Sequence, residues 1–363
     1  MPATGEPSPL PRYLAIAYAL LIVHACLHPF TGWRDSGLPL FDYLSAPFPQ
    51  YYRLEDLVLN VLGYVPLGFV LVPALPLRKA AAILTATLLA ALLSFSVETA
   101  QHFLPTRISS NVDLACNTGG AFIGALFGAL WGRRLFDRNG WLHRWRLRRI
   151  IPGRAGDLGL ILAGLWLLAQ LMPDAMLFES GDLRGFLDLP ALMPFEPERF
   201  MLLESVLVAT SMIGVGLFAR CAMRAVSPWP ILLLLTLAVG AKSLAGYAFF
   251  VPGTPLAWFT PGALDGLLAG AVLLGLALLL PPVPQHALAG MSLLLATTLA
   301  NLIPDNPYLA QELRLLGAGN FLNFHGLTQL TAAAWPVLAL AYLSAIGLWR
   351  GDHLHRRPAD GTL

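Results

Sequence analysis

The stretch AAAILTATLLAALLSFSVETAQHF, residues 80–103, decides the fold class of this chain. It contains no charged side chain before Glu98, so its apolar part is long enough to cross a membrane. A spanning helix needs about 20 mostly apolar residues, because backbone groups in hydrocarbon must bond within the segment. The stretch therefore predicts a membrane-spanning helix with a polar end.

Runs of the same kind recur along almost the whole chain. The protein has 363 residues, of which 56% are hydrophobic and 12% charged, and its mean hydropathy is +0.65. Soluble globular proteins usually carry about 25% charged residues. The composition predicts an all-α, polytopic integral membrane protein with about ten transmembrane helices. The candidate spans are residues 12–29, 56–75, 80–103, 112–131, 157–172, 199–219, 229–250, 261–280, 287–303 and 326–348.

Basic residues predict the orientation of these helices. The connection after the fourth span is rich in arginine, and connections of this kind usually stay in the cytoplasm. Its arginines are Arg133, Arg134, Arg138, Arg144, Arg146, Arg148, Arg149 and Arg154. Alternation from this connection predicts that both termini are cytoplasmic. It also places the acidic segment 173–198 on the opposite side.

The arginine-rich connection also predicts the domain organisation. We expect a four-helix unit over residues 1–132, a basic cytoplasmic linker over 133–156, and a second unit of about six helices over 157–363. One span of each unit carries glycines at four-residue steps, which let helix backbones approach closely in lipid. We assign them to packing and not to a substrate groove. They are Gly120, Gly124, Gly128 and Gly132 in the first unit, and Gly262, Gly266 and Gly270 in the second.

Three outward-going spans end alike, with an amide residue shortly before a proline. The three ends are Gln101-His-Phe-Leu-Pro105, Gln170-Leu-Met-Pro173 and Asn301-Leu-Ile-Pro304. Repetition of this kind occurs in transporter folds. Proline that follows a helix end is the more common cause, and we adopt that interpretation.

Polar side chains gather where the outer ends of three spans are expected. Glu98 and Gln101 share a helix face, since residues three apart are neighbours on a helix. Two further spans begin with a carboxylate and an amide four residues apart, which are the pairs Asp56 and Asn60, and Asp113 and Asn117.

Two kinds of role are open for this polar cluster. A carboxylate in the first turn of a helix favourably meets the helix dipole, which alone accounts for Asp56 or Asp113. Glu98 lies inside its apolar span, where an uncompensated charge costs about 2.5 to 3.5 kcal/mol on insertion scales. Arg107 on the following turn is a candidate partner for Glu98, or a group that grips an anionic ligand with two hydrogen bonds.

These residues form three ordered motifs. They are D-x3-N-x5-P-L-G from Asp56, S-x3-E-x2-Q from Ser94, and R-x5-D-x3-N-x2-G from Arg107. With these motifs, residues 12–132 resemble the VanZ-like family. The resemblance implies a bacterial inner-membrane protein linked to the cell envelope, and the family is named after a protein associated with teicoplanin resistance. It maps the family motifs onto Asp56, Asn60, Glu98, Gln101, Arg107, Asp113 and Asn117.

The second unit carries its own polar candidates. Glu204, Lys242 and Asp265 lie inside predicted spans, where ionisable groups mark a proton or ligand pathway or pair to hold helices together. We expect Lys242 to pair with Asp265, with Glu204 nearby. A further outward-facing patch combines Asn320, Asn323, His325 and Gln329, for which helix capping is the simpler explanation.

Three functions fit these observations. The first is a noncatalytic or transport-like protein that binds a membrane lipid or lipid-linked envelope precursor. The second is an intramembrane enzyme with Glu98 as acid or base and Asp113 assisting. The third is a scaffold that binds envelope-assembly proteins. We expect no cofactor and no nucleic-acid partner, and we expect no metal at His24, His28 and His102 because no hydrolytic zinc motif is present.

Overall fold

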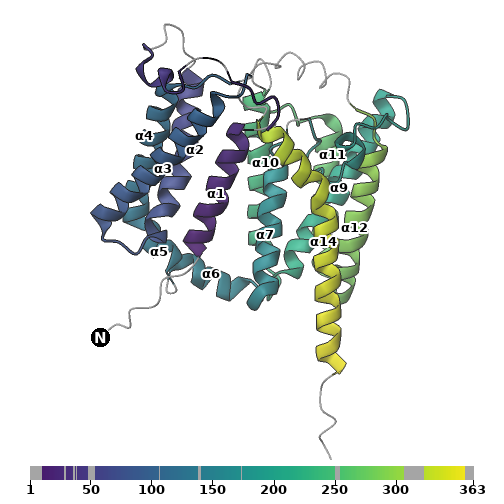
Figure 1. Ribbon diagram of the computed structural model, residues 1–363. Helices are drawn as coiled ribbons and strands as arrows, with labels where there is room; N and C mark the ends of the chain where they lie inside the picture. The colour runs from purple at the N-terminus through teal and green to yellow at the C-terminus, as the bar shows by residue number, and fades with distance from the viewer. Residues whose placement is uncertain are drawn as a thin grey trace, which may run out of the picture. The chain divides into compact units, whose positions relative to one another are not determined.

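The computed structural model describes residues 10–27, 30–35, 37, 39–47, 54–105, 107–137, 140–172, 174–249, 254–305 and 323–355. The regular secondary structure of these residues is helical, with no extended strand among them. It forms two compact units, Met1–Arg148 and Arg149–Leu363. Figure 1 traces both units along the chain.

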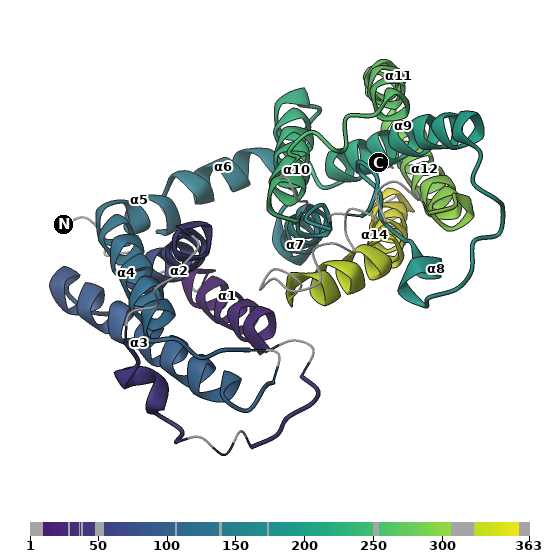
Figure 2. The ribbon, with the colours of Figure 1, turned by 90° about the horizontal axis from the view of Figure 1, so that it is seen from above.

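The first unit is built on four long helices. They are α1 (Leu10–Leu27), α2 (Leu54–Ala74), α3 (Lys79–Gln101) and α4 (Asn111–Phe127). A short 3-10 helix, η1 (Asp42–Ser45), precedes α2. After α4 the chain continues through a π-helical turn, η2 (Gly128–Gly132), and the short helices α5 (Arg133–Phe136) and α6 (Trp141–Arg149). Seen from above, α1, α2, α3 and α4 lie as neighbours (Figure 2).

The second unit is centred on a long buried helix, α9 (Pro197–Cys221), which packs against α11 and α12. The other helices are α7 (Gly153–Ala169), the short α8 (Leu183–Phe186), α10 (Pro228–Phe249), α11 (Pro261–Ala277), α12 (Pro282–Leu302) and α14 (Asn323–His355).

Each of the predicted spans is a helix in the structure. Seven helices in the described part of the chain are long and apolar enough to cross a membrane. The predicted spans at α7, α11 and α12 lie outside this set, because α7 and α11 have only 17 residues each and α12, with 21 residues, is less apolar. An all-helical membrane protein is therefore confirmed, while the number of crossings and the cytoplasmic termini remain predictions.

The closest helix contact of the first unit joins α2 and α4. A Cβ added at Gly120 would lie 2.1 Å from the Val61 carbonyl oxygen, and one at Gly124 would lie 1.9 Å from that of Val65. In the other direction, a Cβ at Gly68 would lie 2.0 Å from the Ala121 carbonyl oxygen. The two backbones therefore touch directly, as glycine-lined helices do in lipid.

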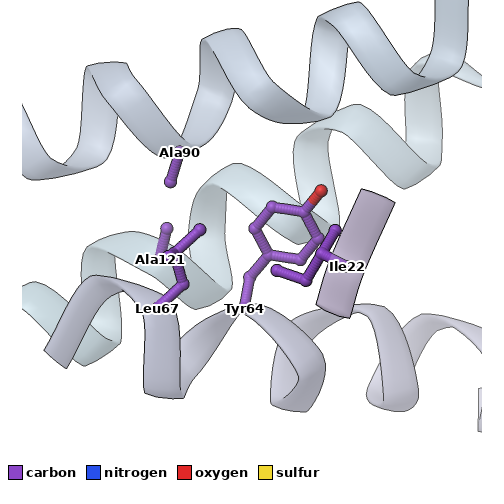
Figure 3. Close-up of a cluster of buried hydrophobic side chains, with 5 residues drawn as sticks. All are labelled: Ile22, Tyr64, Leu67, Ala90 and Ala121. Atoms are coloured by element: carbon purple, nitrogen blue, oxygen red, sulfur yellow. The ribbon is translucent and has the colours of Figure 1, made fainter. Parts of the chain in front are cut away.

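A hydrophobic cluster joins all four helices of this unit. It consists of Ile22 on α1, Tyr64 and Leu67 on α2, Ala90 on α3 and Ala121 on α4. Figure 3 shows these side chains converging between the helices. Small residues on α3 and α4 face large residues on α2, so the layer is closely filled.

The second unit repeats the use of glycine with different partners. A Cβ at Gly266 on α11 would lie 2.6 Å from the Ser205 carbonyl oxygen on α9, and one at Gly262 would lie 2.8 Å from that of Met201. An aromatic cluster lies elsewhere in this unit, where Trp335 contacts Trp166 and Phe218. The packing role that the sequence assigned to the two glycine series is thus observed for both.

Two substitutions on α4 are expected to act in opposite directions. Gly124→Ala forces the helices apart against the Val65 carbonyl, and we expect a loss of about 1–3 kcal/mol of stability. Gly119→Ala on the same helix meets nothing within 4 Å, so it should stabilise by about 0.5–1 kcal/mol. Thermal unfolding in detergent measures both, and equal effects would refute the backbone contact.

Candidate functional site

Glu98 is anchored to the loop between α3 and α4. Its side chain is 4% exposed, and its Oε2 accepts a hydrogen bond of 2.9 Å from the Ser110 backbone N–H. The Ser109 hydroxyl donates to the Glu98 carbonyl oxygen at 2.6 Å. A buried polar group without a partner costs free energy, and here the loop supplies the partner. Glu98 therefore fixes the loop onto the end of α3.

Ser110 also starts α4. Its hydroxyl accepts hydrogen bonds from the backbone N–H groups of Val112 and Asp113, which is the usual N-cap arrangement. Asp113 lies in the first turn, where its carboxylate meets the positive end of the helix dipole. One loop residue thus links Glu98 on α3 to the beginning of α4.

Asp113 is joined to α2 across the glycine contact. The Asn60 Nδ2 group donates to Asp113 Oδ1 at 2.8 Å. Asn60 and Asp113 are 53 positions apart, as are Gly68 and Ala121, which touch further along the same helices. Because α2 and α4 keep this register, the backbone contact aligns the amide with the carboxylate.

Gln101 and Asn117 complete a buried polar layer. The Gln101 Nε2 group donates to the Cys26 carbonyl oxygen at the end of α1, at 3.0 Å. The Asn117 Nδ2 group donates to Ser94 Oγ on α3, also at 3.0 Å. The Oδ1 atom of Asn117 is buried and has no hydrogen-bond partner within the described residues. Helices α1, α3 and α4 therefore each contribute a group to this buried layer.

Arg107 lies on the loop, half-buried beside the same layer. Burial lowers the pKa of its guanidinium, and the Cys26 thiol is among the groups that it senses electrostatically. Arg107 is one candidate partner of Glu98, and the contact that the structure shows for the Glu98 carboxylate is the hydrogen bond from the Ser110 N–H. Ion pairs are seen elsewhere in the described residues, between Arg184 and Asp305 and between Arg199 and Glu196.

Two of the predicted residues of this region cannot be placed. The side chain of Asp56 and the whole of His28 lie outside the described residues. Within the described part of the chain, no three His, Cys, Asp or Glu side chains come together as a metal site.

The segment around η1 packs onto the end of α3, which the sequence did not predict. The Tyr43 hydroxyl lies 3.2 Å from Thr99 Oγ1, and Phe41 stacks on Phe95 with ring centroids 5.8 Å apart. The Asn111 side chain donates to the Ala46 carbonyl oxygen at 2.8 Å. The aromatic residues Phe41 and Tyr43, just before a predicted span, were the feature of the sequence that could have indicated this packing.

The candidates of the second unit do not converge as predicted. Lys242 donates to the Met172 carbonyl oxygen and has Glu179 and Asp174 as its charged neighbours. Asp265 is exposed, so the expected Lys242–Asp265 pair is wrong. Glu204 is buried beside Thr260 at the start of α11, apart from Lys242. The Lys242 ammonium group bonds to a backbone carbonyl. The sequence analysis considered only side-chain partners and therefore did not predict this contact.

The second polar patch is only partly described. Asn320 and the side chains of Asn323 and His325 lie outside the described residues. The Gln329 side chain donates to the Gly185 carbonyl oxygen at 3.4 Å. It lines the same cavity as five acidic residues, Asp174, Glu179, Asp182, Asp188 and Asp305. Among these, burial raises the pKa of Glu179 and of Asp182.

Comparison with known proteins finds a family similarity within the first unit. The family model described as VanZ/LLP1 matches residues 14–132, which contain α1 to α4 and the polar layer. No curated protein and no solved structure gives a significant match.

The Asn60–Asp113 bond should couple the two helices energetically. We expect a double-mutant cycle of Asn60→Ala and Asp113→Ala to give a coupling of about 1–3 kcal/mol, because the bond is half-buried and its acceptor is a carboxylate. Unfolding in detergent provides the measurement. As a control, Asn60→Ala with Asp137→Ala, at the other end of the unit, should be additive. A coupling below about 0.3 kcal/mol for the first pair would contradict the bond.

Proposed function

Because residues 14–132 form a VanZ-like unit of a membrane protein, we propose that this unit binds the polar head of an envelope amphiphile at the loop end of α3 and α4. The ligand class is a lipid-linked sugar, a phospholipid or a lipopeptide. The protein would act in the bacterial cytoplasmic membrane, and protection against a teicoplanin-type lipoglycopeptide is the associated phenotype.

The main support for this proposal is that the polar residues form two layers, one buried and one half-buried. Glu98, Gln101 and Asn117 are buried and bonded within the protein. Asn60, Arg107 and Asp113 are half-buried at the same end of the unit. In this arrangement the buried layer positions the half-buried one, and only the latter reaches a ligand. Support of this kind is what a binding site requires.

The outer residues suit a charged head group. Arg107 can grip a phosphate or carboxylate with two parallel hydrogen bonds. Asp113 offers an acceptor for hydroxyl or ammonium groups, and the Asn60 amide holds its carboxylate in place. Opposite charges at one helix end favour a ligand that carries both anionic and donor groups.

Apolar side chains beside these residues suit the hydrophobic part of the same ligand. Ile108, the neighbour of Arg107, is 89% exposed. Phe30, Trp33 and Phe41 in the segment before α2 are also exposed. Aromatic residues of this kind are enriched where a membrane meets water. The same end of the unit thus offers polar groups for the head of an amphiphile and apolar groups for its hydrophobic part.

A structural lock is the second candidate, and the hydrogen bonds themselves favour it. The bonds of Glu98, Gln101, Asn60 and Asn117 all stay within the protein. A scaffold in an envelope-assembly complex would need no more than such a lock. The acid–base function is less well supported, because the Glu98 carboxylate is buried and engaged by Ser110.

Arg107 separates the two candidates. If it binds a head group, Arg107→Ala should leave the amount of folded protein unchanged and reduce teicoplanin protection to that of an empty vector. Arg107→Lys should retain only part of the protection, because lysine cannot form the bidentate contact. Arg34→Ala, which removes an exposed arginine from the segment before α2, is the matched control and should behave as wild type.

The measurement combines size-exclusion profiles of the tagged protein with teicoplanin susceptibility in one host. Glu98→Gln keeps an oxygen for the Ser110 N–H, so its folded amount and protection should change little. Protection and folded protein that fall together in Arg107→Ala would establish the structural lock. Normal protection by Arg107→Ala would reject the binding proposal.

A further inference from the structure

The second unit contains a cavity of about 290 Å³ in a region that no family match covers. It lies between the segment 174–189, the end of α12 and the start of α9, with residues of α14 at its wall. Pockets for drug-sized ligands begin near this volume. The cavity is therefore large enough for a small organic group.

The segment that covers the cavity is held by two side-chain amides, the buried Gln170 and the half-buried Asn301. Gln170 accepts a hydrogen bond from the Phe178 N–H at 3.1 Å, and Phe178 adopts a left-handed backbone conformation with φ of 63°. The Asn301 side chain donates to the Gly181 carbonyl oxygen at 2.7 Å and accepts from the Arg184 N–H at 2.9 Å. The wall is thus fixed at both ends by α7 and α12.

The charges around the cavity are unequal. Its lining includes one guanidinium, from Arg184, and five carboxyl groups, from Asp174, Glu179, Asp182, Asp188 and Asp305. Arg184 is bound to Asp305, and Asp182 accepts from the Gly185 N–H at the start of α8. Glu179 accepts from the Met176 N–H and lies near Lys242. Asp174 and Asp188 are exposed and have no such bond within the described residues.

A separate feature of the cavity is a hydroxyl group that can accept a hydrogen bond from a ligand. Ser180 lines the cavity, is 8% exposed, and makes no hydrogen bond to any described residue. Buried hydroxyl groups normally have a partner, so this one is available to a ligand. Met172, Phe200 and Ile303 supply apolar surface in the same cavity, and an aromatic ring also attracts cations.

We propose that the cavity binds an organic cation, namely a primary ammonium or guanidinium group carried on a short apolar chain. Asp174 and Asp188 attract and hold the cation, and the Ser180 hydroxyl accepts one of its N–H groups. The apolar chain packs on Met172 and Phe200. The apolar surface distinguishes this ligand from a metal ion, which would need oxygen ligands on most sides. This site is independent of the function proposed for the first unit.

Binding of n-butylammonium to the full-length protein in nanodiscs tests the proposal. Isothermal titration at constant ionic strength should show saturable binding of n-butylammonium and none of butanoate. The double variant Asp174→Asn and Asp188→Asn should weaken binding by at least about tenfold, because it removes the two exposed carboxylates of the cavity. Asparagine tolerates the left-handed conformation of Asp188, whose φ is 53°, so this variant should fold.

Two further variants make the test decisive. Ser180→Ala should weaken n-butylammonium binding without changing thermal unfolding of the free protein. Asp265→Asn, which removes an exposed carboxylate outside the cavity, should bind as wild type does. The proposal is overturned if wild type shows no saturable binding, if butanoate binds equally well, or if the folded double variant retains full affinity. Calcium binding without n-butylammonium binding would also overturn it.

Discussion

The direct contact between the backbones of α2 and α4 is the constraint on which the first unit depends. Lipid tails are as apolar as leucine, so helices in a membrane gain little from burying apolar side chains against each other. Close packing must supply the attraction, and Gly68, Gly120 and Gly124 allow it by removing side chains from the contact. The contact also fixes the register that brings Asn60 to Asp113.

From this register the polar layer follows. Asp113 can start α4 beside Asn60 only if the preceding loop delivers Ser110 to the end of α3, where Glu98 accepts its N–H. Ser110 then serves both helices, as acceptor for α4 and as donor to α3. The hydrogen bonds of these residues form one chain across three helices. Loss of one bond would therefore disturb the positions of the other residues. That connectivity is equally useful to a binding site and to a structural lock.

The sequence predicted the helices well, because length and hydropathy are properties of single segments. It also identified the packing role of the glycines, since their four-residue spacing has few other uses. The pairing of Lys242 with Asp265 was wrong, and the carboxylate of Glu98 contacts a group that the sequence did not suggest, for one physical reason. Their partners are the Ser110 N–H and the Met172 carbonyl, and backbone groups leave no mark in a sequence. The cavity of the second unit was missed because a loop forms much of it.

The three amide-before-proline helix ends show what a more physical reading of the sequence can recover. Proline alone was taken as their cause, yet each amide bonds to the backbone of another segment. Gln101 binds the Cys26 carbonyl, Gln170 binds the Phe178 N–H, and Asn301 binds Gly181 and Arg184. An amide suits this task because it donates and accepts without carrying a charge into the membrane. A Gln or Asn at the end of a long apolar helix can therefore fasten a neighbouring segment, which is the end of α1 for Gln101 and the segment 174–189 for Gln170 and Asn301.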